Sequence, residues 1–192
     1  MDLIDRLLQY DKELMISINS KWDNPVLDFV CQHIRETYFW APLYLFFITL
    51  AVINFGKKGW LWVLAAIATV ALTDQVSSNL IKNNIIRLRP CRDQEIAHQI
   101  RFFINYCPGS SSFTSSHATN HFGITTFIVA TLRPYLGNPI LWLFLASAAV
   151  CYAQVYVGVH YPIDVICGAT IGTAIGYGMS RIFNNKIGLP TL

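Results

Sequence analysis

The sequence predicts an all-α integral membrane protein, a bundle of about five transmembrane helices that follows an N-terminal amphipathic segment. Of the 192 residues, 54% are hydrophobic and only 13% are charged, whereas soluble domains carry about 25% charged residues. The apolar residues fall into blocks, and each block is close to the roughly 20 residues that a helix needs to cross a bilayer. Glycine, proline and basic residues separate the blocks, as is typical of turns. The length fits a single domain over residues 1–192.

The elements follow from this pattern in chain order. Residues 1–36 mix apolar with charged residues, which indicates an amphipathic helix on the membrane or packed on the bundle, or equally an ordinary helical cap. Five spans are expected, at residues 38–55, 60–81, 117–132, 140–157 and 161–183. The hydrophilic stretch over residues 82–116 lies between the second and third spans, so we expect it to form a long loop outside the membrane.

The distribution of basic residues predicts the orientation in the membrane. The alternation of five spans puts residues 82–116 and the region of His160 on the same face. The opposite face carries five basic residues: Lys57, Lys58, Arg133, Arg181 and Lys186. The positive-inside rule makes that face cytoplasmic, so we expect a bacterial inner membrane protein whose polar segments face the periplasm. Cys91 and Cys107 bracket most of the outward loop and would form a disulfide if that face is oxidising.

Three segments bring chemically useful residues to the outward face. They cover residues 82–90, 113–117 and 154–164. Together they supply two histidines, a carboxylate, hydroxyls and several cations, without an acidic cluster that would hold a metal. Cations and hydroxyls suit phosphate oxygens, which accept charge-assisted hydrogen bonds. A histidine backed by a carboxylate suits a nucleophile or a base.

Local helix signals place these residues at helix starts. Pro162 fits the first turn of the fifth span, so His160 lies at the mouth of that helix and Asp164 about one turn further in. A carboxylate at that position fixes the tautomer of the imidazole. Ser115 and Ser116 occupy N-cap positions before the third span. The free N–H groups of a helix start bind phosphate, so helix ends are expected to build the pocket.

The three segments resemble the type 2 phosphatidic acid phosphatase family of membrane lipid phosphatases, which has a vanadium haloperoxidase-like active site. The first family motif is a lysine, six residues and Arg-Pro, and Lys82 with Arg89-Pro90 matches it. The second is Pro-Ser-Gly-His, which residues 114–117 follow as Thr-Ser-Ser-His. The third is Ser-Arg, five residues, His, three residues and Asp, which residues 153–164 follow except that Ala-Gln replaces Ser-Arg. The order of the motifs also matches.

The resemblance implies a role for each matching residue. His160 would attack phosphorus and form a phosphohistidine, Asp164 would orient it, and His117 would act as general acid. The phosphate-binding residues would be Lys82, Arg89, Ser115 and Ser116. No metal or cofactor is expected.

Two departures from the family pattern change these expectations. Thr114 in place of proline alters only the turn, whereas Gln154 stands where the family has a phosphate-binding arginine and brings no charge. Loss of a charged donor costs on the order of 1.5–3 kcal/mol. Arg87, Arg92 or Arg101 would have to supply the missing charge, and we favour Arg92 because it lies next to the Arg-Pro turn.

Further polar residues inside the spans have structural interpretations. Asp74, Ser78 and Lys82 share one helix face and are expected to form a polar ladder that supports the lysine. His117 and His121 have the spacing of a zinc pair, but no third ligand is evident. We therefore expect His121 to pack or hydrogen-bond inside the bundle.

The expected reaction is hydrolysis of a lipid phosphate such as phosphatidic acid, phosphatidylglycerol phosphate, undecaprenyl diphosphate or a lipid A phosphate. One alternative is phosphotransfer to a lipid alcohol. The other is a degenerate lipid-binding or transport protein, which Gln154 favours. A net charge of +3 and the lack of a binding motif argue against nucleic acid. The fifth span carries small residues at a spacing of four: Gly168, Gly172 and Gly176. These residues allow close helix packing or a homodimer.

Overall fold

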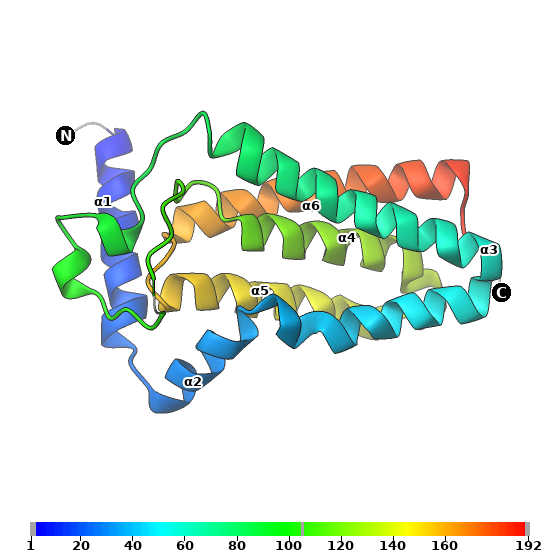
Figure 1. Cartoon of the computed structure of the whole chain (residues 1–192), viewed down its shortest axis with the longest axis horizontal. Helices are drawn as coiled ribbons and strands as arrows, with labels where there is room; N and C mark the ends of the chain where they lie inside the picture. Colours follow the sequence, from blue (N-terminus) through cyan, green and yellow to red (C-terminus); the bar gives the residue numbers. More distant parts are fainter. Residues whose placement is uncertain (1–2, 105, 191–192) are drawn as a thin grey trace.

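The structure, a computed structural model, describes residues 3–104 and 106–190. Its principal elements are α1 (Leu3–Ile16), α2 (Pro25–Ile34), α3 (Ala41–Asp74), α4 (Ser116–Leu136), α5 (Trp142–Tyr156) and α6 (Pro162–Lys186). Figure 1 shows α3, α4, α5 and α6 running along the long axis, while α1 crosses one end of the bundle. A π-helical segment, Gln75–Ile81, prolongs α3. The described part of the chain is therefore helical, as the sequence predicted.

Helix α3 folds back on itself at Gly56. This residue has φ 53° and ψ −121°, a backbone conformation that glycine adopts without the steric cost of a side chain. The two arms meet at this bend and diverge away from it (Figure 1), and close to the bend a Cβ at Gly59 would clash with the carbonyl group of Ala51. The turn predicted at residues 56–59 is therefore present, although the helical hydrogen bonding is interrupted only locally.

Three helical segments of the described chain are long and apolar enough to cross a membrane. They are Thr37–Ile81, Asn138–Tyr156 and Pro162–Lys186. The first of them contains both arms of α3. Helix α4 is not among them, and its first half carries threonine, asparagine and histidine side chains. The chain is an integral membrane protein, and the number of about five spans stays a prediction.

Helices α4 and α6 pack closely through small residues. A Cβ added to Gly172 would clash with the backbone of Thr119, and one added to Gly176 with the backbone of Gly123. The close packing predicted for the glycine series of the last span is confirmed, and its partner is α4 of the same chain. A homodimer would therefore have to use another face of α6.

The N-terminal segment packs on one end of the bundle. Asp11 and Met15 of α1 are buried, and Asn19 donates hydrogen bonds to the carbonyls of Arg101 and Tyr156, each at 2.7 Å. The loop over residues 82–115 lies at this same end of the molecule (Figure 1). Two short helices, α1 and α2, thus cover the end of the bundle that carries the loop.

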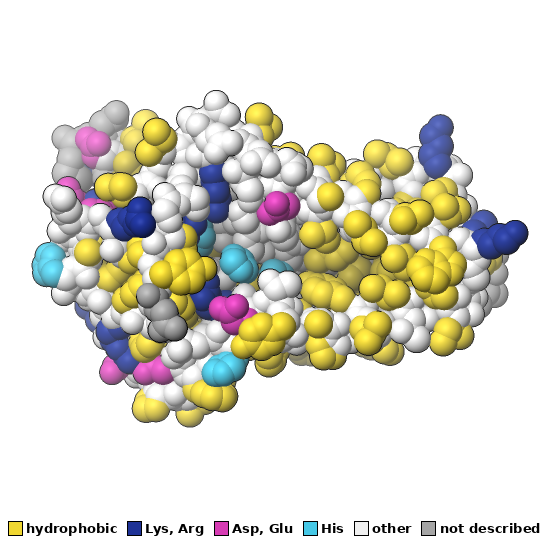
Figure 2. All heavy atoms as spheres, in the orientation of Figure 1, with side chains coloured by type: hydrophobic (Ala, Val, Ile, Leu, Met, Phe, Trp, Pro, Cys, Tyr) yellow, Lys and Arg dark blue, Asp and Glu magenta, His cyan; other side chains and the backbone are white. Residues whose placement is uncertain are grey.

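The loop contains the disulfide that the sequence allowed. Cys91 and Cys107 are bonded, with their Cα atoms 6.1 Å apart. The bend of α3, with Lys57 and Lys58, lies at the other end of the bundle (Figure 1), where Figure 2 shows basic side chains projecting. The loop and the basic turn therefore lie at opposite ends of the bundle, and the orientation in the membrane stays a prediction.

Candidate active site

His160 and Asp164 are connected through a serine that the sequence analysis did not single out. The His160 Nδ1 atom lies 3.6 Å from Asp164 Oδ2, which is longer than a hydrogen bond. Ser112 Oγ donates to Asp164 Oδ2 at 2.5 Å and lies 3.4 Å from His160 Nδ1. All three side chains are buried. The hydroxyl of Ser112 therefore accepts from the imidazole N–H while it donates to the carboxylate.

The other nitrogen of His160 faces a buried arginine. Arg89 Nη1 lies 3.1 Å from His160 Nε2 and also donates to the carbonyl of Val159 at 3.1 Å. A guanidinium only donates, so Nε2 is the acceptor and the proton resides on Nδ1. The lone pair of Nε2 thus points to the cation that would hold a phosphate. This is the tautomer that a nucleophilic histidine requires.

Asp164 is held in place from several directions. Its Oδ1 accepts from Arg87 Nη1 at 2.6 Å, and its Oδ2 accepts from the backbone N–H of Tyr161 at 3.0 Å as part of a capping box. The second arm of Arg87 donates to Asp11 of α1 at 2.6 Å. Asp11 also accepts from the backbone N–H of Ile163 at 2.9 Å. The first turn of α6 is therefore fixed to α1 and to the loop.

The start of α4 lies beside the start of α6. Ser115 is the N-cap of α4 and accepts from the N–H of Ala118, as the sequence predicted, and its own N–H donates to the carbonyl of Asp164 at 3.1 Å. His117, two residues later, lies close enough to His160 and Lys82 to interact with both electrostatically. The structure thus brings the predicted histidines and the lysine to one place.

Burial in this cluster shifts the pKa values of its basic groups. Burial, and then the neighbouring Arg89, lowers the pKa of His160 to about 4, although Asp164 opposes this. Burial and Arg89 also lower the pKa of Lys82 to about 8. Burial lowers the pKa of Arg89 to about 10. His160 is consequently neutral and Arg89 charged at neutral pH, as required of a nucleophile beside an anion-binding group.

Three predicted phosphate ligands occupy other surroundings. Gln154 is fully buried, and neither atom of its side-chain amide has a hydrogen-bond partner in the described chain. Arg92 is exposed and donates to the carbonyl of Cys107 at 3.1 Å. Ser116 bonds Ser78 at 2.9 Å. The compensation proposed for Arg92 stays a prediction, and the structure offers another candidate.

That candidate is Arg35, at the C-terminus of α2. Its side chain is only 11% exposed and contacts Glu36 at 3.1 Å, while its Nε is buried and has no acceptor among the described residues. It interacts electrostatically with both His117 and Arg89. No sequence signal distinguished Arg35, because it lies outside every motif and reaches the site only through the fold.

An apolar groove opens from this cluster along the bundle. Its volume is about 730 Å³, and it runs between the two arms of α3 and α4. His117 and Asn120 line one end, and residues such as Phe47, Val63 and Ile128 line the rest. Figure 2 shows a hollow lined by hydrophobic side chains beside histidine side chains. The cluster of basic side chains around His160 is thus continuous with an apolar groove.

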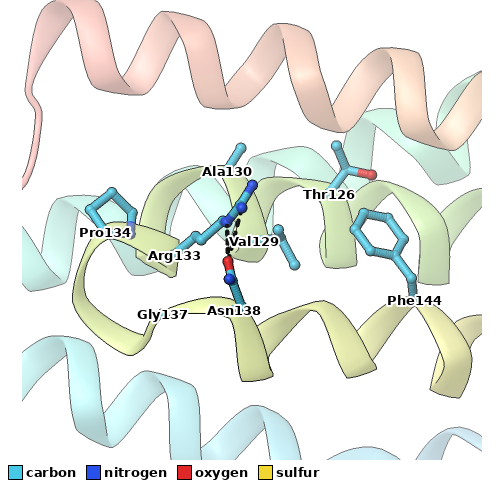
Figure 3. A pocket seen from close by; sticks show the side chains of 8 residues that line it. All are labelled: Thr126, Val129, Ala130, Arg133, Pro134, Gly137, Asn138 and Phe144. Carbon is cyan, nitrogen blue, oxygen red and sulfur yellow. Dashed lines mark hydrogen bonds between the residues drawn. The ribbon is translucent and has the colours of Figure 1, made fainter.

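A second hollow lies by the turn between α4 and α5. Its volume is about 550 Å³. Arg133, its one charged lining residue, donates to Asn138 at 2.9 Å (Figure 3). None of the described residues that line this hollow is a histidine or a carboxylate, so the hollow lacks a side chain for general acid–base catalysis.

Two curated proteins resemble this chain over most of its length. Lipid A 4'-phosphatase of Bacteroides thetaiotaomicron is 29% identical over 92% of this chain and 76% of its own length. Lipid A 4'-phosphatase of Porphyromonas gingivalis is 24% identical over 94% of this chain and 75% of its own length. The names of these relatives support a phosphatase, the enzyme class that the sequence predicted.

Solved structures share the fold. A PAP2-type phosphatidylglycerolphosphate phosphatase from Bacillus subtilis aligns with a TM-score of 0.68 and 22% identity, over 94% of this chain and 88% of the other. LpxE of Aquifex aeolicus aligns with a TM-score of 0.61 and 24% identity, over 88% of this chain and 93% of the other. The PAP2 superfamily model matches residues 59–187. The chain therefore belongs to the PAP2 superfamily.

The lowered pKa of His160 gives a testable pH dependence. Because burial disfavours the imidazolium, the ring should stay neutral as the pH falls through 6.5 and become protonated only near pH 4. Histidine-selective NMR in detergent would follow the resonance that disappears in His160→Gln. A titration midpoint at histidine's usual value of about 6.5 would contradict the buried environment.

Proposed function

We propose that the protein hydrolyses a lipid phosphate without a metal ion, through a phosphohistidine on His160. The observation that carries the proposal is the lone pair of His160 Nε2, which faces Arg89 at 3.1 Å beside an apolar groove lined by His117. A nucleophile, a cation and a general acid then surround one point, and the groove leads from it into the bundle.

The reaction has two steps. In the first, the Nε2 lone pair attacks phosphorus, the bond from phosphorus to the lipid oxygen breaks, and His117 protonates that oxygen. The imidazolium formed at His160 is stabilised through Ser112 by Asp164. In the second step, His117 takes a proton from water, the water oxygen attacks phosphorus, and the P–N bond breaks to release phosphate.

The phosphate oxygens would be held by Lys82, Arg89 and Arg35. Arg89 is already fixed by the Ser110 carbonyl and hydroxyl, each at 3.0 Å, so its guanidinium is preorganised. Arg35 brings the charge that Gln154 lacks, and its unpartnered Nε is available for an oxygen. The N–H groups at the start of α4 add an anion-binding helix terminus.

The apolar groove would hold an acyl chain of the substrate. It runs between helices of the membrane bundle and is lined mainly by aliphatic and aromatic side chains, and its polar end adjoins the proposed catalytic cluster. Among lipid phosphates, the lipid A 4'-phosphatase names of the two relatives favour lipid A as the substrate. We propose that the site faces the periplasm from the inner membrane, since the basic turn at Lys57 and Lys58 lies at the opposite end.

Removal of the proposed nucleophile tests the reaction itself. His160→Ala should lower phosphate release by at least about 10³-fold, on the scale seen when a catalytic nucleophile is removed. The assay measures free phosphate in detergent from a panel of lipid phosphates, with a chelator and no added metal. His98→Ala, which removes an exposed histidine of the same loop, should retain the wild-type rate. Equal rates in wild type and His160→Ala would exclude the proposed reaction.

Substitution of Arg35 and of Arg92 separates the two candidate cations. Arg35→Gln should lower kcat/KM by roughly 10- to 100-fold, the loss of one charged hydrogen bond, and should weaken inhibition by inorganic phosphate to a similar extent. Arg35→Lys should recover part of the loss. Arg92→Gln is the matched control and should change little, because its side chain is exposed. If Arg92→Gln lowered kcat/KM more than Arg35→Gln, Arg92 would be the residue that supplies the missing charge.

A further inference from the structure

A carboxylate lies inside the apolar groove, next to the proposed phosphate site. Asp74, at the end of α3, lines the groove together with Asn120 and Ser116. Its Oδ1 accepts hydrogen bonds from Ser78 at 3.0 Å and from Asn120 Nδ2 at 3.3 Å. In the described part of the chain its other oxygen, Oδ2, has no donor, and no basic side chain forms an ion pair with it. The Asp74–Ser78 contact of the predicted polar ladder is present, but among the described residues neither side chain bonds Lys82. Ser78 bonds Ser116 of α4 instead, and Asp74 keeps a free acceptor.

Asn120 adds a second unused acceptor at the same place. Its Nδ2 is committed to Asp74, while its Oδ1 is buried and has no partner among the described residues. A buried acceptor such as Asn120 Oδ1 is costly without a donor, and a carboxylate within a membrane span is costly even though Asp74 is only partly buried. Both groups therefore call for a hydrogen-bond donor, and the groove is the side from which a ligand can bring one.

The position of this pair relative to the proposed phosphate site fixes which part of a lipid it would meet. Ser78, one helical turn from Asp74, bonds Ser116 at 2.9 Å, and Ser116 directly precedes His117. The pair thus lies about one turn deeper in the groove than the catalytic level, and one turn rises about 5.4 Å. That distance corresponds to a few covalent bonds from phosphorus, where the acyl chains of a lipid are attached.

We propose that Asp74 and Asn120 form a subsite that binds a hydroxyl or amide N–H group of the lipid, next to the carbon that bears the phosphate. The proposal rests on the proposed lipid phosphatase function and specifies the substrate class. An ester at this position offers only acceptors, so it would leave Asp74 Oδ2 and Asn120 Oδ1 unpaired and close to further oxygens. An amide N–H or a hydroxyl would satisfy one of them. Amide-linked or hydroxylated lipid phosphates are therefore preferred over purely ester-linked ones.

The test uses two synthetic lipid phosphates that differ in one group. Their acyl chain is attached to the carbon beside the phosphate-bearing carbon either through an amide or through an ester. Wild type should show a kcat/KM ratio of amide to ester of roughly tenfold or more, the value of a hydrogen bond to a charged acceptor. Asp74→Asn removes one acceptor and introduces an N–H donor, so the ratio should fall to about one or below.

The amide-to-ester ratio of kcat/KM is compared within each variant. A loss of folded protein lowers both rates equally and leaves this ratio unchanged, whereas a loss of recognition changes it. Thr73→Val is the matched control, since the hydroxyl of this buried neighbour bonds only the carbonyl of Val70, and its ratio should equal that of wild type. If Asp74→Asn slows both lipids equally, Asp74 merely supports Ser116 and the subsite is excluded. If wild type hydrolyses neither lipid, the proposed function fails, and thermal stabilisation by the two lipids decides the subsite. Greater stabilisation by the amide supports the subsite, and equal stabilisation overturns it.

Discussion

The guanidinium of Arg87 joins the three segments on which the site depends. One arm bonds Asp164 at the start of α6 and the other bonds Asp11 of α1, each at 2.6 Å. The guanidinium also stacks on the ring of Tyr161, 4.1 Å from its centroid. The two carboxylates are essentially inaccessible, at 1% and 0% exposure. Removal of one partner from such a buried pair costs roughly 3–5 kcal/mol, because the other charge stays buried and unpaired.

This shared arginine explains why α1 is part of the framework of the site. Lys12, next to Asp11, pairs with Asp93 of the loop at 2.9 Å, and Asp93 accepts from the hydroxyl of Tyr161 at 2.8 Å. Helix α1, the loop and the first turn of α6 are thereby held in one arrangement. Because the N–H of Ser115 bonds the carbonyl of Asp164, the start of α4 takes its place from the same framework. The relative position of His117 and His160 is a consequence of these contacts.

The sequence was informative where a signal is local. Neighbouring residues predict three local features of the structure. These are the turn at Gly56, the N-cap role of Ser115 and the place of Asp164 one turn into α6. Matching of three motifs then placed the chain in its family. Helix α4 was expected to cross the membrane from its length and neighbours, but its polar side chains weaken the hydropathy signal.

Long-range contacts were beyond such reasoning. Asp11 lies 76 residues from Arg87, and Ser112 lies 52 residues from Asp164, so no periodicity or spacing links them. Arg35, Arg87 and Arg92 are equivalent as residue types, and only the packing makes the first nearly buried, the second a bridge and the third exposed. The fold class is therefore predictable from composition, whereas the surroundings of the reacting groups depend on how α1 and α2 pack on the end of the bundle.

The central claim, attack by His160 on phosphorus, is tested most directly by trapping the phosphorylated enzyme. Wild-type protein turning over a lipid with labelled phosphate would be quenched rapidly in alkali, which preserves phosphohistidine, and the labelled peptide identified by mass spectrometry. The account predicts label on His160, and none in His160→Ala. Release of free phosphate without any label on the protein, or label on another residue, would contradict it.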